Sequence, residues 1–355
     1  MLQRYKIKRP GPFKTRQFAS DNCSGICPEA FVAMEQANTG HAAAYGEDEW
    51  TAQAADMLRD FFDTDCEVFF TFNGTSANAI TLSSMCRSYH AVLTSDVSHI
   101  ESNECGAPEF FSHGSKLLLI DSRQGKVTPD GIHAYAGRPE NIHFPKPHVV
   151  SLTQPTEFGT IYTVDELKAI NDVCEQYQLK THMDGARFAN ALVALDTHPA
   201  EITWKAGVDV LCFGGTKNGL AVGEAIVFFN MELAREFDYH CKQAGELASK
   251  MRFITAPWIG MLQDNAMHRY AAHANEMARY LADRLTAIPG VELLFPVETN
   301  AVYIALSQEQ EKAMHEHGWH FHIFDKAGAR FMCSWDTGHE EIDAFAADLA
   351  EVLGR

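Results

Sequence analysis

The sequence predicts an α/β protein in which a large domain, built on a mostly parallel sheet, precedes a smaller α+β domain. Apolar runs of strand length alternate with helix-length segments as far as residue 229, and such alternation indicates crossover units covering both faces of a sheet. Beyond Ala256-Pro257 this alternation gives way to short strands between two helical segments. At 355 residues the chain exceeds the size of most single cores. We therefore expect domains at residues 1–257 and 258–355.

The elements of the large domain follow from spacing and from residues that begin helices. Pro28 suits the first position of a helix, which we expect to reach residue 37. Residues 49–62 place Met57, Leu58 and Phe61 at helical spacing and predict a second helix. Strands are predicted at 66–72, 91–94, 116–120, 148–153, 179–183, 208–213 and 224–229, and further helices at 76–88, 163–177, 189–194 and 231–249.

The elements of the smaller domain are shorter and less regular. A long helix is predicted at 258–287, because Pro289-Gly290 can end it. Strands are predicted at 291–295, 302–305, 320–324 and 329–333, and a last helix at 340–353. No internal repeat interrupts this order.

Composition excludes several classes of function. The formal charge is 29 − 47 = −18, which argues against a nucleic-acid or anionic-membrane partner. The nine cysteines are odd in number and lie mostly in apolar segments, so we expect reduced thiols and no zinc ligand set. Residues 1–16 lack the apolar stretch of a signal peptide, and no apolar run approaches the ~18 residues of a membrane span. We therefore expect a soluble, cytoplasmic protein. The histidine-rich run 315–322 spans the end of one predicted helix and the start of a predicted strand, so we expect no metal site there.

Two residues at strand ends suggest a chemistry. Lys217 follows an apolar strand that breaks into glycines, and Asp184 ends the strand before it. Alone, the lysine fits a surface position and the aspartate a helix cap. Together, a lysine that can form a Schiff base and an aspartate that can hold a pyridinium nitrogen are the groups that pyridoxal phosphate (PLP) needs most.

Further candidates lie in segments of the same kind. Residues 72–78 follow a strand and open a helix, so Gly74 and Thr75 could bind a phosphate there, although plain N-capping explains most such turns. His99 lies just past a strand, where it could stack on a cofactor ring or serve only structure. Arg330 sits in a short apolar strand, where it could bind a carboxylate bidentately or form an ordinary salt bridge.

In this order the segments resemble the low-specificity threonine aldolases, a branch of the fold-type I PLP-dependent enzymes. The resemblance covers nearly the whole chain and is strongest to the Pseudomonas-type subgroup, which also handles β-phenylserine. The segments that carry it are Phe-Ala-Ser-Asp-Asn (18–22), Ala-Tyr-Gly-Glu-Asp (44–48), Asn-Gly-Thr-Ser-Ala-Asn (73–78), His99, His-Met-Asp-Gly-Ala-Arg (182–187), Gly-Gly-Thr-Lys-Asn-Gly (214–219) and Arg330.

The resemblance implies a role for each matching residue. Lys217 matches the Schiff-base lysine, Asp184 the partner of the pyridine nitrogen, and His99 the residue that stacks on the ring. It implies cofactor contacts for Gly74, Thr75, Arg187, Thr216 and Arg252, substrate contacts for Ser20, Tyr45 and Arg330, and a second catalytic histidine at His143. Asn103 and Gln154 stand where relatives can carry acids, which leaves the substrate side chain and the stereochemistry at Cβ open.

The implied reaction is retro-aldol cleavage of L-threonine, L-allo-threonine or a related β-hydroxy-α-amino acid to glycine and an aldehyde. A β-eliminating lyase or an aminotransferase on the same fold is the alternative among enzymes. A non-catalytic binding module is the alternative outside them. The resemblance also implies a homo-oligomer, expected to be a homotetramer, in which Tyr45, Lys242 and Arg252 are candidate donors to a neighbour's site.

Overall fold

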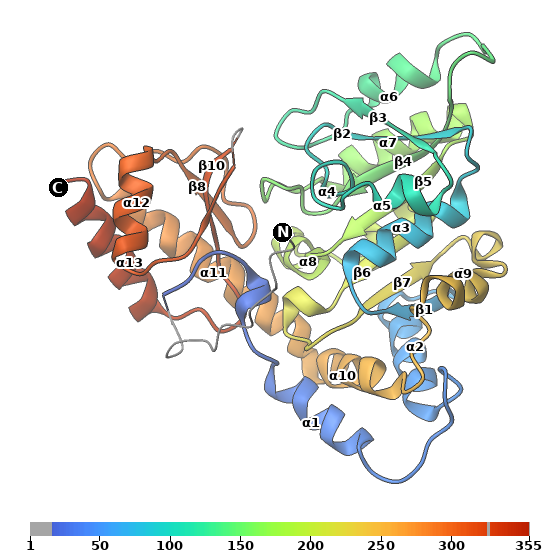
Figure 1. Ribbon diagram of the computed structural model, residues 1–355, viewed down its shortest axis with the longest axis horizontal. Coiled ribbons are helices and arrows are strands. Elements are labelled where there is room, and N and C mark those ends of the chain that lie inside the picture. The colour runs from blue at the N-terminus through green and yellow to red at the C-terminus, as the bar shows by residue number, and fades with distance from the viewer. Residues whose placement is uncertain (1–15, 325–326, 355) are drawn as a thin grey trace, which may run out of the picture.

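The computed structural model describes residues 16–324 and 327–354, which form two sheets with helices packed around them (Figure 1). The larger sheet has seven strands in the order β1-β7-β6-β5-β4-β2-β3. Neighbouring strands from β6 through β3 run parallel, whereas β7 is antiparallel to both β6 and β1. The strands are β1 (Glu67–Thr71), β2 (His90–Ser95), β3 (Lys116–Ile120), β4 (Lys146–Thr153), β5 (Lys180–Gly185), β6 (Val210–Gly214) and β7 (Glu224–Phe228).

The central strands are buried on both faces, which explains why the sequence shows continuous apolar runs there. Successive side chains of a strand point to opposite faces. Val210 accordingly belongs to the core beneath α3 and α9, while its neighbour Leu211 belongs to the core on the other face, which also contains Trp258. The predicted mostly parallel sheet is therefore confirmed.

Thirteen α-helices are present in the described residues. They are α1 (Pro28–Ala37), α2 (Glu49–Phe62), α3 (Gly74–Met85), α4 (His99–Ser102), α5 (Ala107–Phe111), α6 (Pro129–Ala136), α7 (Val164–Tyr177), α8 (Phe188–Leu195), α9 (Phe237–Ala244), α10 (Arg252–Leu262), α11 (Ala266–Thr286), α12 (Gln308–Glu316) and α13 (His339–Val352). Among these described residues no helix combines the length and apolar character needed to cross a membrane.

The smaller sheet is antiparallel and takes the order β8-β10-β9, from β8 (Ala301–Ile304), β10 (Gly328–Met332) and β9 (His322–Phe324). Its core contains Trp319, Phe331 and Phe345 together with Phe18 from the other end of the chain. The backbone of Phe18 donates to the carbonyl of His320 at 2.7 Å and accepts from the amide of Met332 at 2.9 Å. The N-terminal segment is thereby held against the smaller sheet, which brings Ser20 to the boundary between the two sheets.

Several boundaries differ from the sequence predictions. The single helix predicted at 258–287 is two helices, α10 and α11, because Asp264 and Asn265 adopt positive φ angles of 49° and 59° between them. The helix predicted at 231–249 is confined to α9, and the strand predicted at 291–295 is reduced to one bridge at Leu293. The boundary predicted between residues 257 and 258 falls inside α10 and stays a prediction.

Candidate active site

The candidate site lies where the carboxyl ends of β4, β5 and β6 meet. In the register of the sheet, Thr153 on β4 is the partner of Asp184 on β5, which in turn is the partner of Cys212 on β6. Lys217 lies three residues beyond the end of β6, on a short 3-10 turn (Thr216–Asn218). Open α/β sheets bind their ligands at this edge, and the two residues that first suggested a chemistry both lie at it.

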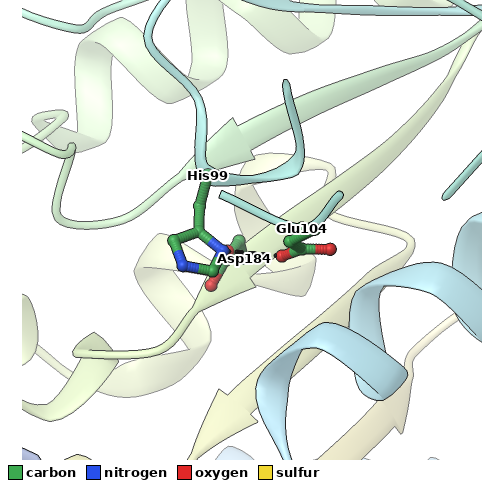
Figure 2. Close-up of side chains that lie close together, drawn as sticks. All are labelled: His99, Glu104 and Asp184. Atoms are coloured by element: carbon green, nitrogen blue, oxygen red, sulfur yellow. Dashed lines mark hydrogen bonds and ion pairs between the residues drawn. The ribbon is translucent and has the colours of Figure 1, made fainter. Parts of the chain in front are cut away.

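A chain of hydrogen bonds connects Asp184 to His99. The side-chain nitrogen Nδ2 of Asn78, on α3, donates to Oδ2 of Asp184 and to Oε1 of Glu104, both at 2.9 Å. The same Glu104 oxygen lies 2.7 Å from Nδ1 of His99. Figure 2 shows His99, Glu104 and Asp184 grouped within this network. The sequence analysis missed both Asn78 and Glu104.

This network sets the protonation of its members. The hydrogen bond to Glu104 raises the pKa of His99, and burial raises the pKa of Glu104 while its bonds to His99 and Asn78 oppose that rise. Ligand atoms of His99, Glu104 and Asp184 lie within 4.8 Å of one another. The amide of Asn78 already bridges the two carboxylates, so the cluster is a fixed hydrogen-bond relay that leaves the far side of the imidazole ring free to face a ligand.

His182, in the same motif as Asp184, serves the core instead. It is fully buried, with Nδ1 at 2.9 Å from the hydroxyl of Ser151 and Nε2 at 3.3 Å from the sulfur of Cys212. Burial lowers the pKa of His182 to about 4, so the ring is neutral. It fixes β5 between its two neighbours and thereby the position of Asp184 two residues further on.

The turn that carries Lys217 depends on a close approach of two backbones. A Cβ added at Gly214 would lie 2.2 Å from the carbonyl oxygen of Ala186, so only glycine fits there. Among the described residues no hydrogen bond or ion pair is seen for Nζ of Lys217, and the buried hydroxyl of Thr216 lies beside Glu224, whose Oε2 accepts from the amide of Gly215 at 2.7 Å. Burial raises the pKa of nearby Glu224, and the charge of Lys217 opposes that rise. Lys217 is thus partly buried, with its side-chain nitrogen close to Glu224.

The N-terminus of α3 is a candidate anion site. The side chain of Asn73 accepts a hydrogen bond from the amide of Ser76 at 2.9 Å, which is ordinary capping. The amides of Gly74 and Thr75 lie in the first turn, where a helix offers no internal acceptor. A Cβ at Gly74 would meet nothing within 4 Å. The cap therefore uses the amide of Ser76 and leaves those of Gly74 and Thr75 available to an anion.

Arg187 is held in a buried ion pair that the sequence analysis did not foresee. Its Nε and Nη2 reach the two oxygens of Asp21 at 2.6 and 2.8 Å, and the amide of Asn300 donates to Asp21 at 3.1 Å. Burial alone would raise the pKa of Asp21, but the Arg187 guanidinium outweighs it and the pKa is lowered. The predicted contact Ser20 lies next to Asp21, and its hydroxyl accepts from the amide of Asn22 at 3.1 Å.

Arg330 approaches this pair from the smaller sheet. Its Nη2 donates to the carbonyl of Ala19 at 3.0 Å, whereas its Nε is buried without a partner among the described residues. Burial lowers the pKa of Arg330, and the charge of Arg187 lowers it further. The guanidinium of Arg330 is therefore buried, has a free donor and lies near the guanidinium of Arg187. This combination favours an anionic ligand.

The structure does not bring His143 to this site. His143 is exposed on the turn before β4, with its amide bonded to Asn141 at 2.9 Å. The site lies at the other end of that strand, beyond Thr153. The role that the resemblance implies for His143 has no support from the geometry of this single chain and stays a prediction.

Tyr45 and Arg252 lie away from the relay. Tyr45 is about half exposed and lines a surface hollow of about 630 Å³ with Phe72 and Phe253, and Lys242 lies 4.3 Å from the centre of its ring. Arg252 begins α10, and its Nε is buried without a partner in the part of the chain that the structure describes.

The two departures from the resembled pattern have different surroundings. Gln154 is fully buried, and its side chain donates to the carbonyl and accepts from the amide of Tyr162, both at 2.9 Å. Gln154 thus closes the loop 154–162. Asn103 is exposed and bonds to Ser102 at 2.7 Å. The closed loop presents Glu157, an acid that the sequence analysis missed, to the amide of His99 at 2.8 Å.

Comparison with known proteins decides the family. The model of the beta-eliminating lyase family matches residues 17–309. The low specificity L-threonine aldolase of Pseudomonas aeruginosa is 59% identical over 341 residues, which cover 96% of this chain and 99% of that protein. This chain belongs to the low-specificity L-threonine aldolase family.

The solved structures agree with this assignment to the threonine aldolases. A threonine aldolase of Leishmania major superposes with a TM-score of 0.89 at 28% identity, over 95% of this chain and 99% of that one. A structure of SPT with PLP shares the fold, with a TM-score of 0.71 at 16% identity over 95% of this chain and 86% of that one. The fold-type I class predicted from the sequence is therefore confirmed for this threonine aldolase family member.

Proposed function

We propose that this protein is a PLP-dependent aldehyde-lyase that cleaves β-hydroxy-α-amino acids, L-threonine and L-allo-threonine among them, to glycine and an aldehyde. One observation carries the proposal. Lys217 follows β6 beside the Asp184 relay, close enough for its charge to act on Asp21 and Glu224, while Arg330 has a buried Nε without a partner among the described residues. Such a site has one place for a cofactor and another for an amino-acid carboxylate.

The residues present fit PLP. The carboxylate of Asp184 favours the protonated form of a pyridine nitrogen, and the open space at Gly74 leaves the first-turn amides of α3 accessible to a phosphate. The unpartnered hydroxyl of Thr216 adds a donor beside Lys217. When bound, PLP supplies an electron-accepting ring that permits a bond at the substrate's Cα to break.

The protein's own groups select which bond breaks. Arg330 binds the substrate carboxylate and so fixes rotation about the bond between nitrogen and Cα. His99, oriented by Glu104, would stack against the cofactor ring. A group that accepts the proton of the β-hydroxyl completes the site.

Glycine formation distinguishes this proposal from the alternatives. The test is incubation of the PLP-loaded protein with L-threonine, L-allo-threonine and the phenylserine isomers, followed by chromatographic measurement of glycine and aldehyde. We expect glycine and aldehyde in equal amounts. A keto acid with ammonia would indicate β-elimination, and a keto acid with an aminated cofactor would indicate an aminotransferase. If none of the substrates gave a product, the non-catalytic binding module would be the remaining interpretation.

We also propose a cytoplasmic homotetramer with sites completed across an interface. Phe72, which lines the same hollow as Tyr45, is an exposed apolar side chain, as are Phe31 and Val32 on α1, and their exposure supports burial against another copy. Lys242 and Arg252 flank this surface in sequence and are candidate donors to a neighbour.

Subunit mixing tests the shared site. Lys217→Ala and Arg252→Ala proteins, each inactive alone, should regain partial activity after verified exchange of subunits. At a mixed interface, one of the two sites is then built from residues that carry neither substitution. Absence of recovery would mean that Arg252 serves its own chain or no site, and a monomer in light scattering would contradict the assembly itself.

A further inference from the structure

Glu157 lies at the candidate site with one carboxylate oxygen occupied and the other free. Its Oε1 accepts hydrogen bonds from the amide of His99 and from the hydroxyl of Thr153, both at 2.8 Å. Its Oε2 is buried and has no partner among the described residues. A buried carboxylate oxygen without a donor costs free energy unless a ligand supplies one, so this atom calls for an explanation beyond packing.

The backbone of Glu157 connects it to the arginine side of the site. The hydroxyl of Tyr303 donates to the carbonyl of Glu157 at 2.6 Å. Tyr303 on β8 is the register partner of Arg330 on β10. Glu157 therefore stands between His99, which flanks the cofactor position, and the strand pair that carries Arg330.

The loop around Glu157 is held rigidly. The hydroxyls of Thr156 and Thr160 lie 2.7 Å apart, and the side chain of Thr299 donates to the carbonyl of Gly159 at 2.8 Å. The amide of Ile161 donates to Glu298 at 2.7 Å. The carboxylate of Glu157 is consequently fixed before any ligand arrives.

We propose that Glu157 is a catalytic residue of the aldol cleavage and that its Oε2 accepts the proton of the substrate's β-hydroxyl. This inference rests on the proposed function. The O–H bond breaks as the proton moves to Oε2, and its electron pair forms the C=O bond of the aldehyde. The Cα–Cβ bond breaks, its electron pair stays with Cα, and Cα gains a proton to give glycine. Glu157 releases its own proton before the next turnover, so one hydrogen moves from oxygen to Cα overall.

The surroundings suit a group that gains and loses a proton near neutral pH. Burial raises the pKa of Glu157 to about 7, with its bonds to Thr153 and His99 opposing the rise and the charge of Asp184 adding to it. The ionisable groups that face Glu157 are His99 from α4, Asp184 from β5, Tyr303 from β8 and Tyr162 from its own loop. The best proton acceptor has a pKa near the working pH.

Glu157→Gln tests the proposal, because an amide oxygen can still accept from His99 and Thr153 while the proton acceptor is lost. Glu298→Gln is the matched control, since it alters a glutamate that accepts from an amide of the same loop. The measurements are the PLP dissociation constant from absorbance titration of the apo-protein, the exchange of glycine Cα hydrogens for deuterium by NMR, and kcat/KM for cleavage against pH.

We expect Glu157→Gln to bind PLP within about twofold of wild type and to exchange glycine hydrogens within about threefold, since neither requires a β-hydroxyl. Cleavage should fall at least ~10²-fold, as for loss of a general base. The rise of kcat/KM through pH about 7 should persist in Glu298→Gln and disappear in Glu157→Gln.

Equal loss of exchange and cleavage in Glu157→Gln would make Glu157 a structural residue, and undiminished cleavage would overturn the proposal outright. If Glu157→Gln fails to fold, Glu157→Asp decides, because it keeps a carboxylate set back by one methylene. Cleavage should then fall at least ~10-fold with exchange retained; parallel loss contradicts the inference. A wild type that exchanges glycine hydrogens but cleaves no substrate would overturn the proposed function and this inference together, whereas a cleaving Glu157→Gln removes the inference alone.

Discussion

The two sides of the candidate site differ in how their charges are paired. On the side of the large sheet, Asn78 joins Asp184 and Glu104, and Glu104 holds His99. On the side of the small sheet, Arg330 keeps a free buried nitrogen beside a second arginine. On the first side the charged groups are already joined to one another by hydrogen bonds before a ligand binds, whereas on the second side Arg330 gains a missing partner from a ligand. We conclude that the large sheet is organised for a permanent cofactor and the small sheet for a transient anionic substrate.

Lys217→Ala should produce the largest effect, because it removes the group that joins the two sides. We expect cleavage to fall about 10⁴-fold or more with the fold retained, since the lysine is the nucleophile toward the cofactor. Cleavage rate and circular dichroism are the measurements, with Lys205→Ala, an exposed partner of Glu201, as the control. If borohydride still fixed PLP to a lysine of the Lys217→Ala chain, the assignment would be lost.

Arg330→Ala should weaken the substrate side alone. Removing one partner of a buried, charged hydrogen-bonded pair costs about 2–5 kcal/mol of binding free energy. We therefore expect kcat/KM to fall between ~30-fold and ~10³-fold or more. Arg330→Lys should recover only part of this, because an ammonium lacks the bidentate geometry. Arg284→Ala, which breaks an exposed pair with Asp343, should leave kcat/KM unchanged. A similar fall in both alanine variants would remove Arg330 from substrate binding.

Glu157→Gln should stabilise the apo-protein at high pH. The pKa of Glu157 rises from 4.5 to about 7 on folding, so the folded state holds this proton more tightly than the unfolded state. Stability contributed by this group is therefore full below pH 4.5 and is lost as pH rises to 7, by at most about 3 kcal/mol.

Urea denaturation of wild type and Glu157→Gln at pH 8 and pH 5 measures this effect. We expect the variant to be the more stable at pH 8, with a smaller difference at pH 5. A variant less stable than wild type at pH 8 would show that the charged carboxylate is stabilising and that the pKa is not raised.

Asn78→Ala should break the relay and give the smallest of these effects. The substitution leaves carboxylate oxygens of Asp184 and Glu104 without their shared donor. Leaving a buried acceptor without its donor costs about 1–3 kcal/mol of free energy. We expect PLP to bind about 10-fold more weakly. Asn190→Ala is the matched control, since Asn190 is also buried and bonds to Asn275 at 3.0 Å, outside the relay. That control should lose stability but keep its affinity for PLP; equal losses of affinity in both would make the relay generic packing.

The sequence predicted the parts of the site that depend on local pattern. Lys217 and Asp184 follow buried strands, and the carboxyl ends of parallel strands converge, so their proximity follows from the fold class. The anion site at Gly74 likewise follows from a strand, a turn and a helix in succession. These residues needed no knowledge of distant contacts.

The missed residues depend on long-range geometry. Asp21 meets Arg187 across 166 positions of sequence, and nothing local to either residue indicates the other. Glu157 faces the site because Gln154 and Tyr303 fix a loop that has no periodic pattern. The place of His143 likewise depends on the direction of β4, which determines which neighbouring loop of the same chain reaches the site. A signal for Glu157 did exist, in that it follows the end of β4 by four residues.

The dissociation constant of PLP from apo-protein carrying Arg330→Ala tests the division of the site most directly. If the large sheet alone holds the cofactor, this constant should match wild type within about twofold, while glycine binds to the reloaded variant at least ~10-fold more weakly. A loss of PLP affinity in Arg330→Ala as large as that in Asn78→Ala would contradict the account, because the two sides would then bind one molecule together.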